Sequence, residues 1–292
     1  MRNSKYFSTL EMNFGKTLKR NYKIFYKIII TSLSSIIGIC LFLFIHKFIL
    51  ESEVMNVITD TLPVKSQSQA IPKVFHTIWL DFGKGEDVFP RYIENSRKLL
   101  ELHPGWELKL WKEKEIENLI KEKFPSALET FLNYDLPIKK HDFSRIVILF
   151  CFGGVYVDHD GIALKNIESL FESLKFVIIN ESVNEFFPSN AFIASISKFD
   201  ILKKYIDEMC KPGAAKKSVI SATGPKMLKK VMLKNFKNYT QDEIRIYPSK
   251  FMFELKSSRN RSVKNQNPET LRLLYPDCYI LHLFDYTWKN KK

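Results

Sequence analysis

The sequence predicts an α/β domain with a mostly parallel sheet, and two observations lead to this fold class. Segments rich in β-branched and aromatic residues alternate with amphipathic segments through residues 71–292. Apolar residues make up 45% of the 292 residues and charged residues 26%, which is typical of a globular chain and excludes a disordered or collagen-like one. We expect one sizeable domain with accessory segments before it.

The expected elements follow from the period of the apolar residues and from the Pro and Gly positions. His103-Pro104-Gly105 should end one helix, and Gly153-Gly154 should end a second helix that is apolar on most sides. Strands are predicted at 72–80, 106–111, 155–157, 175–180, 190–196, 244–247 and 278–284. Helices are predicted at 90–103, 112–123, 126–132, 138–152, 199–210 and 224–236.

A stretch without charge runs from Ile28 to Ile45, near the minimum length for a helix that crosses a membrane. A cleaved signal peptide is the alternative, but a small-residue cleavage site would then follow, whereas His46 and Lys47 follow here. Seven Lys or Arg residues precede the stretch, which predicts a cytosolic N-terminus and a lumenal remainder. The expected organisation is a basic tail at 1–27, a transmembrane signal anchor at 28–47, a stem at 48–70 and a folded domain at 71–292.

The net charge of +13 raises the question of a nucleic-acid partner. Beyond the N-terminal tail the Lys residues are spread over many segments, so we expect a solvated basic surface and no nucleic acid, with an anionic substrate as the alternative. A lumenal location would permit one disulfide among three cysteines and glycosylation at three sequons. These residues are Cys151, Cys210 and Cys278, and Asn180, Asn238 and Asn260.

Two carboxylates directly follow the strand predicted at 155–157, in the sequence Asp158-His159-Asp160. On extended chain, residues i and i+2 project from one face, so both Asp side chains should converge and His159 should point to the opposite face. Hard oxygen ligands suit Mn²⁺ or Mg²⁺, which keep other positions for water and a diphosphate. Ligands also gather at the carboxyl ends of strands in α/β sheets. A solvated strand end would carry the same pair without a metal.

Asp142 and Arg145 lie one turn apart on the otherwise apolar helix predicted at 138–152. Burying both is costly unless they pair with each other or bind a ligand. Gly153-Gly154 would let the chain turn sharply and bring the backbone close to that ligand. By contrast, His76, His103 and His141 match no zinc-binding spacing, and we expect them to be packing or capping residues.

The pattern Asp142-x-x-Arg145…Gly153-Gly154-Val-Tyr-Val-Asp158-x-Asp160 resembles the core signature of glycosyltransferase family thirty-two, the DXD-motif sugar transferases. Its members include yeast-type initiating α-1,6-mannosyltransferases and the enzymes that mannosylate inositol phosphorylceramide. Further similar blocks begin at Ile71 and Leu102 and include Thr223-Gly224-Pro225, so the resemblance spans about 71–288. It implies a GT-A (Rossmann-like) fold, a nucleotide-sugar donor and retention of anomeric configuration.

The resemblance also implies roles for individual residues. Asp158 and Asp160 would hold the metal and, with Arg145, carry out catalysis by stabilising the departing diphosphate. The donor-binding residues would be Trp79 against the base, Asp142 and Arg145 on the sugar and phosphate side, Gly153, Gly154, Asp158, and His282 and Trp288 over the diphosphate. Asp158 and Asp160 would therefore be the metal ligands, for Mn²⁺ or Mg²⁺.

These implications predict a single-pass type II membrane protein of the Golgi (or the ER) that transfers mannose from GDP-mannose to inositol phosphorylceramide. A glycoprotein N-glycan as acceptor, or a UDP-sugar such as UDP-galactose as donor, is the alternative within the family. A hydrolase is disfavoured because two carboxylates on one strand face cannot flank a bond from opposite sides. A catalytically silent lumenal binding protein would have little need for the charges of Asp142, Arg145, Asp158 and Asp160 together.

Overall fold

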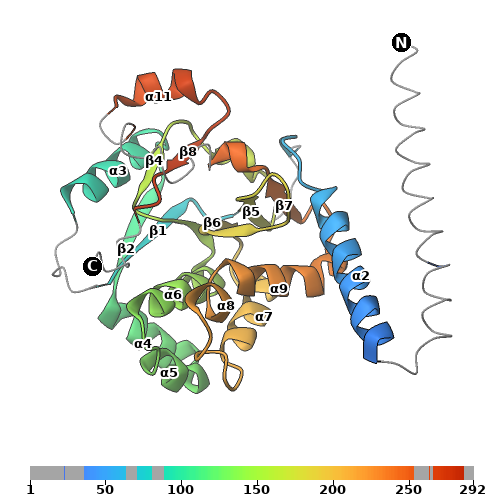
Figure 1. Ribbon diagram of the computed structural model, residues 1–292. Coiled ribbons are helices and arrows are strands. Elements are labelled where there is room, and N and C mark those ends of the chain that lie inside the picture. Colours follow the sequence, from blue (N-terminus) through green and yellow to red (C-terminus); the bar gives the residue numbers. More distant parts are fainter. Residues whose placement is uncertain are drawn as a thin grey trace, which may run out of the picture. The chain divides into compact units, whose positions relative to one another are not determined.

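The computed structural model describes residues 36–63, 71–80, 89–252 and 266–285, together with Lys23 and Val263. The chain divides into two compact units, Met1–Glu53 and Val54–Lys292. We describe the units separately, and Figure 1 shows the elements of both.

The expected anchor at 28–47 falls in the first unit, and its residues 28–35 lie outside the described residues. Helix α2 (Ile36–Met55) begins inside the expected anchor and continues into the expected stem. Among the described residues, no helix combines the length and the apolar character needed to cross a membrane.

The second unit begins at Val54, earlier than the expected domain boundary at residue 71. The side chain of Val54 is buried, and Ile58 forms a parallel bridge with Ile246. The Thr59 backbone N–H donates to the Ile246 carbonyl oxygen at 3.2 Å. Residues 54–59 of the expected stem therefore belong to the folded domain, while residues 64–70 lie outside the described residues.

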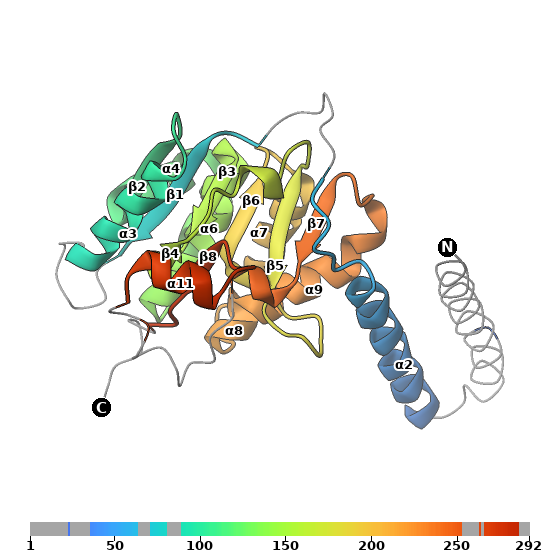
Figure 2. The same cartoon turned by 90° about the horizontal axis from the view of Figure 1, so that it is seen from above.

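The core of the second unit is a six-stranded sheet in the order β2-β1-β3-β6-β5-β7 (Figure 2). Its strands are β1 (Val74–Trp79), β2 (Glu107–Lys112), β3 (Gly154–Val157), β5 (Phe176–Asn180), β6 (Pro188–Ser195) and β7 (Ile244–Tyr247). Strand β6 is antiparallel to both of its neighbours, and the other strand pairs are parallel. The prediction of an α/β domain with a mostly parallel sheet is confirmed.

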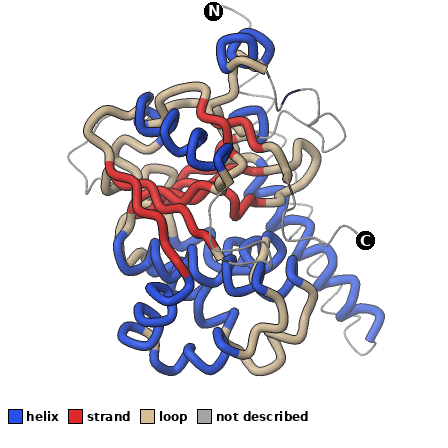
Figure 3. Tube along the Cα trace, turned by 90° about the vertical axis from the view of Figure 1, so that its left-hand side faces the viewer, coloured by secondary structure: helices blue, strands red, loops and turns tan. Residues whose placement is uncertain are grey.

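Helices cover both faces of this sheet (Figures 1 and 3). One layer consists of α4 (Glu113–Lys123), α5 (Pro125–Leu132), α6 (Pro137–Phe152), α7 (Asp200–Met209), α8 (Val219–Ala222) and α9 (Pro225–Asn235). The other side holds α3 (Pro90–Glu101), α11 (Pro268–Leu274) and a two-stranded sheet of β4 (Gly161–Ala163) and β8 (Ile280–His282). Single 3₁₀ turns lie at Glu168–Leu170, Phe236–Asn238 and Ser249–Phe251.

Helix α6 lies against β1, β3 and β6 in the middle of the domain. Its central apolar residues, from Ile146 to Leu149, are fully buried, as the sequence predicts for a helix that is apolar on most sides. Pro137 occupies its first turn, and Gly153 ends it with a φ of 68°. Because this helix is enclosed, any charged side chain on it must find a partner inside the domain.

The strands and helices predicted from the apolar pattern are all present within a few residues of their expected bounds. Three described elements were not predicted, namely β4, α8 and α11. Strand β4 is only three residues long and exists because it pairs with β8, with Gly161 opposite His282. A pairing between segments so distant in the chain leaves no local periodicity to detect.

Candidate active site

A cavity of about 380 Å³ opens at the carboxyl ends of β1 and β3. Trp79 reaches it from the end of β1, and Asp158 and Asp160 reach it from the turn after β3. Helix α6 contributes Asp142 and Arg145. The fold therefore gathers at one edge of the sheet the charged residues that the sequence singled out, where parallel strands usually present ligands.

The two Asp residues of the DXD motif lie in a turn rather than on extended chain. Strand β3 ends at Val157, and the Gly161 N–H donates to the Asp158 carbonyl oxygen at 3.1 Å. The expectation that His159 points to the opposite face is wrong, because the alternation of a strand stops at Val157. His159 lines the same cavity as the two carboxylates and stacks on Tyr92 with ring centroids 5.6 Å apart.

His282 joins the two carboxylates through the β4–β8 pairing. Its Nε2 lies 3.1 Å from Asp160 Oδ1 and 3.6 Å from Asp158 Oδ2. One ligand atom from each of these three residues lies within 4.8 Å of the others. Carboxylate oxygens and an imidazole nitrogen fit Mn²⁺, and the oxygens also fit Mg²⁺. The sequence predicted the two Asp ligands and placed His282 only over the diphosphate.

Electrostatics within this set favour a cation between the carboxylates. Burial opposes the charged form of His282, but Asp160 and Asp158 outweigh it and raise the pKa of His282 to about 10. Burial likewise opposes ionisation of Asp158, yet Arg145 and His282 lower the pKa of this carboxyl. The pKa of Asp160 is also lowered, mainly by His282, against the effect of burial. Positive charge at this point is therefore strongly stabilised, and a metal ion that used His282 as a ligand would take the place of the proton on its ring.

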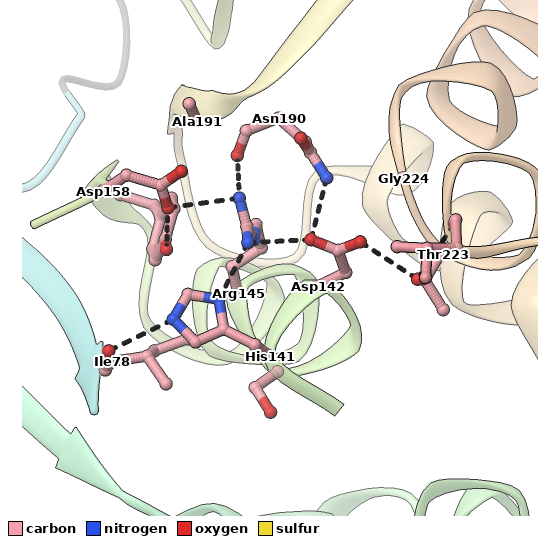
Figure 4. A network of polar contacts seen from close by, with 12 residues as sticks. Ile78, His141, Asp142, Arg145, Asp158, Asn190, Ala191, Thr223 and Gly224 are labelled. Atoms are coloured by element: carbon pink, nitrogen blue, oxygen red, sulfur yellow. Dashed lines mark hydrogen bonds and ion pairs between the residues drawn. The ribbon is translucent and has the colours of Figure 1, made fainter. Parts of the chain in front are cut away.

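Arg145 is 2% exposed and connects the metal-binding set to α6 (Figure 4). Its Nη1 donates to the Asn190 carbonyl oxygen and lies 3.4 Å from Asp158 Oδ1. Its Nη2 lies 2.8 Å from Asp142 Oδ1. The guanidinium also stacks over the Tyr156 ring at 4.5 Å. The planar guanidinium group thus orients the carboxylates of Asp142 and Asp158 at the same time, which the single ammonium group of a lysine could not do.

Asp142 is held by three side chains (Figure 4). Besides Arg145, the Asn190 amide donates to its Oδ1 at 3.0 Å and the Thr223 hydroxyl donates to its Oδ2 at 3.0 Å. Burial raises the pKa of Asp142 to about 6 against the effect of Arg145, so the carboxyl is ionised at neutral pH. The internal ion pair with Arg145 that the sequence left open is present.

His141 has a larger role than the expected packing residue. Its Nδ1 accepts a hydrogen bond from Arg145 Nη2 at 2.8 Å, and its Nε2–H donates to the Ile78 carbonyl oxygen at 3.1 Å. Burial and the neighbouring Arg145 lower the pKa of His141 to about 3, so the ring is neutral. By contrast, His76 and His103 are packing residues as expected, each bonded to a backbone carbonyl group.

Aromatic rings line the side of the cavity next to β1. Trp79 is 8% exposed and makes edge-to-face contacts with Phe89, Tyr92 and His159. Its indole N–H is buried and has no hydrogen-bond partner among the described residues. A buried donor without a partner costs free energy, so a ligand that accepts this hydrogen bond would be favoured.

The remaining predicted site residues lie elsewhere. Gly153 and Gly154 are not among the described residues that line the cavity, and their binding of the donor stays a prediction. A Cβ atom on Gly153 would come 2.7 Å from the Ser197 nitrogen, and one on Gly154 would come 2.7 Å from the Val74 carbonyl oxygen. With φ angles of 68° and 94°, both residues are required for close packing of the chain. Trp288 lies outside the described residues.

Charge in the cavity is opposite to the basic charge of the whole chain. Four carboxylates line it, those of Asp142, Asp158, Asp160 and Glu181. Within the described ranges, Arg145 is the one Lys or Arg side chain that also lines it. An anionic diphosphate would enter such a cavity only together with a cation, because its charge would otherwise meet an excess of negative charge.

Glu181 was missed from the sequence although a signal was present. It directly follows the strand predicted at 175–180, just as Asp158 directly follows the strand predicted at 155–157. The structure shows that Asn180 is 1% exposed and that its amide donates to the Glu185 carbonyl oxygen at 2.9 Å, so the folded domain offers no acceptor amide there. Among the described residues, no disulfide joins any of Cys151, Cys210 and Cys278.

Known proteins resemble this chain in sequence. Residues 90–177 match the family described as a glycosyltransferase sugar-binding region containing a DXD motif. Mannosyl phosphorylinositol ceramide synthases SUR1 and CSH1 of Saccharomyces cerevisiae are 40% and 26% identical over 92 and 182 residues. These alignments cover 32% and 60% of this chain but 23% and 46% of the yeast proteins, so the chain spans less than half of either relative.

An uncharacterized glycosyltransferase of Acanthamoeba polyphaga mimivirus is 26% identical over 225 residues, covering 75% of this chain and 84% of the viral protein. Among solved structures, the PaToxG glycosyltransferase is 17% identical with a TM-score of 0.43, over 66% of this chain and 80% of that one. GlyE of Streptococcus pneumoniae is 15% identical with a TM-score of 0.41, and the match covers 76% of this chain and 57% of GlyE. Such low TM-scores add nothing to the fold that the strand order already defines.

The region that matches the glycosyltransferase family contains the DXD turn at the edge of the α/β sheet. The matching region and the curated relatives support the resemblance to the DXD-motif sugar transferases. The resemblance inferred from the sequence is therefore confirmed.

Proposed function

We propose that this protein is a metal-dependent, retaining glycosyltransferase that moves mannose from GDP-mannose to inositol phosphorylceramide. One observation carries the proposal, namely that Asp158, Asp160 and His282 present ligand atoms close enough to hold one cation, in the cavity that Arg145 and Asp142 also line. The yeast relatives, named as mannosyl phosphorylinositol ceramide synthases, support the lipid acceptor.

Charge balance supports the requirement for a metal. Mn²⁺ or Mg²⁺ bound at this set would neutralise the charge that grows on the departing diphosphate. Arg145 would hold the Asp158 carboxylate in one orientation, since its Nη1 lies 3.4 Å from Asp158 Oδ1. The Asp285 N–H donates to Asp160 Oδ2 at 2.8 Å and would fix the second carboxylate in the same way. Both carboxylates are therefore oriented before a donor arrives, which lowers the cost of reorganisation.

Aromatic and apolar residues would place the donor and exclude water. Trp79 and Tyr92 would contact the nucleotide base, with the free indole N–H of Trp79 as a donor to it. Ile138 and Ile220 line the cavity as well and would help to keep water from the sugar carbon. We propose front-face attack by the acceptor hydroxyl in one ion-pair-like step, so that the anomeric configuration is retained.

A lipid acceptor would require the protein to work at a membrane. We propose that residues 28–47 anchor it in the Golgi membrane with the domain in the lumen. In support, the described part of this segment exposes large apolar side chains, with Leu43 and Phe44 at 58% and 69% exposure. Contact of such side chains with water is unfavourable, whereas their contact with lipid is favourable.

A donor panel tests the proposal. The full chain in detergent is incubated with Mn²⁺, inositol phosphorylceramide and either GDP-mannose or a UDP-sugar, and nucleotide release is measured. We expect GDP release that needs both the metal and the acceptor. Faster nucleotide release from UDP-galactose than from GDP-mannose would contradict GDP-mannose as the donor. Transfer to an N-glycan instead of the lipid would contradict inositol phosphorylceramide as the acceptor. Absence of turnover together with tight nucleotide binding would indicate a binding protein.

A further inference from the structure

Glu181 is the carboxylate of the cavity to which the proposed function gives no role. It directly follows β5, whose pairing with β6 changes register between Ile178 and Asn180. Such an irregularity bends a strand and redirects the side chains beside it. Here the side chain that follows, Glu181, lines the cavity.

The loop that carries Glu181 is held in place by Asn180. The Asn180 amide donates to the Glu185 carbonyl oxygen at 2.9 Å, and its Oδ1 accepts a hydrogen bond from the Phe187 N–H at 2.6 Å. The Glu181 N–H donates to the Phe187 carbonyl oxygen at 2.8 Å. The position of Glu181 is therefore determined by the fold and not by a free loop.

Glu181 is prepared to accept hydrogen bonds. Burial raises the pKa of Glu181 above its usual value, and the nearby Ser189 and His282 oppose this rise. A carboxylate has about four acceptor positions, so the proximity of Ser189 leaves capacity for a ligand.

The other carboxylates nearby have structural or metal-binding explanations. Asp142 pairs with Arg145, and Asp158 and Asp160 face His282. In the Glu181 loop, Glu185 pairs with Lys229 at 3.2 Å and its side chain is 58% exposed. No Lys, Arg or His in the described part of the chain forms an ion pair with Glu181. Stability of the fold does not explain a carboxylate placed in this way.

We propose that Glu181 accepts a hydrogen bond from a sugar hydroxyl group in the cavity and so positions that sugar for transfer. This inference rests on the proposed function. The hydroxyl belongs either to the transferred sugar or to the acceptor, because both carry the same chemistry. A sugar hydroxyl suits the site because it donates a hydrogen bond without adding negative charge beside Asp158. No bond to Glu181 forms or breaks, so its role is that of a positioning residue.

The test compares Glu181→Gln with Glu185→Gln, a control in the same loop that removes an exposed carboxylate outside the cavity. Binding of GDP with Mn²⁺ is measured by calorimetry, and kcat and KM are measured for hydrolysis of GDP-mannose and for transfer to inositol phosphorylceramide. We expect Glu181→Gln to reduce transfer by about 10- to 100-fold, the effect of losing a charged hydrogen bond. GDP binding should stay within about twofold of the wild type, and Glu185→Gln should match the wild type in every measurement.

The two sources of the hydroxyl give different results. If Glu181 binds the transferred sugar, hydrolysis and transfer fall together in Glu181→Gln. If it binds the acceptor, hydrolysis is unchanged and the KM for the acceptor rises. Transfer at the wild-type rate in both Glu181→Gln and Glu181→Asp would overturn the inference.

Glu181→Asp keeps the charge on a shorter side chain. It keeps the inference testable if Glu181→Gln fails to fold. It should also lose activity while it retains the melting temperature. If the wild-type chain itself turns over no nucleotide sugar, the proposed function fails before the variants are compared. The failure of the inference and the failure of the proposed function are thus distinguishable.

Discussion

The surroundings of Glu208 on α7 and the cavity differ in their ratio of basic to acidic side chains. Glu208 accepts hydrogen bonds from Lys211, Lys230 and Lys234 at 2.7, 2.6 and 3.1 Å. All three lysines are at least 42% exposed, so one carboxylate is surrounded by more positive charge than it needs. In the cavity the proportions are reversed, because four carboxylates line it together with one guanidinium, that of Arg145.

This difference separates charges that stabilise the fold from charges that serve a ligand. Pairs with exposed lysines, such as those of Glu208, contribute modestly and are screened by salt. The cavity carboxylates are buried or half-buried, oriented and left with excess negative charge, an arrangement that costs stability unless a cation binds. Changes at the two regions should therefore affect different measurements, as the following predictions state in order of decreasing size.

The largest effect is expected for Asp160→Asn. This change removes one metal ligand while it keeps the size of the side chain, so transfer should fall about 1000-fold, equivalent to about 4 kcal/mol. The measurement is the initial rate of nucleotide release in Mn²⁺ buffer. Asp277→Asn, which removes an exposed carboxylate, is the control, and an unchanged rate in Asp160→Asn would refute the metal role.

The next effect is expected for Arg145→Met. It leaves Asp142 and Asp158 buried beside each other without their partner, so the free energy of unfolding should fall by about 3–5 kcal/mol. Urea denaturation followed by circular dichroism measures this loss. If Arg145→Met were as stable as the wild type, Arg145 would not balance the charge of the cavity in the way described.

A smaller effect concerns metal binding itself. Mn²⁺ at 100 times its dissociation constant should increase the free energy of unfolding by about 2.7 kcal/mol, because it binds only the folded set. Thermal unfolding with and without Mn²⁺ measures the increase. It should be absent in Asp160→Asn and retained in Glu208→Gln. Equal stabilisation of both variants would place the metal outside the cavity.

The smallest effect is expected at Glu208. Partial burial opposes its ionisation, but Lys211, Lys230 and Lys234 lower its pKa to about 2 from the usual 4.5. Because the pKa is lower in the folded state, this stabilisation is complete above about pH 4.5 and is lost as the pH falls from there through about 2. Glu208→Gln should cost about 1 kcal/mol at pH 7, and this cost should disappear only below about pH 2. A cost that does not decrease as the pH falls through this range would contradict this origin.

The part of the site that lies close together in sequence was predictable. Asp158 and Asp160 share one turn, and Asp142 and Arg145 share one turn of α6. Their patterns are local, so strand and helix periodicity were enough to pair them. Asp158 and Asp160 nevertheless do not converge through the alternation of an extended strand. The chain leaves extended geometry at Asp158, which brings His159 into the cavity as well.

The residues that complete the site come from distant segments. Asn190 and Thr223 hold Asp142, and His282 meets the Asp pair only because β8 pairs with β4. No short-range pattern encodes such a meeting, since it depends on how β4, β6, α8 and β8 pack together. The position of Glu181 depends in addition on a register change in β5.

The amino-acid sequence alone determined the α/β class, the order of the main elements, the DXD turn and the charged pair on α6. These features arise from contacts within a few residues, where the period of apolar side chains is decisive. Only the tertiary structure decided that His282 joins the two Asp residues, that His141 orients Arg145 and that the two glycines serve packing. The physical reason is that the register and packing of distant segments result from many weak contacts, none of which has a signature of its own in the chain.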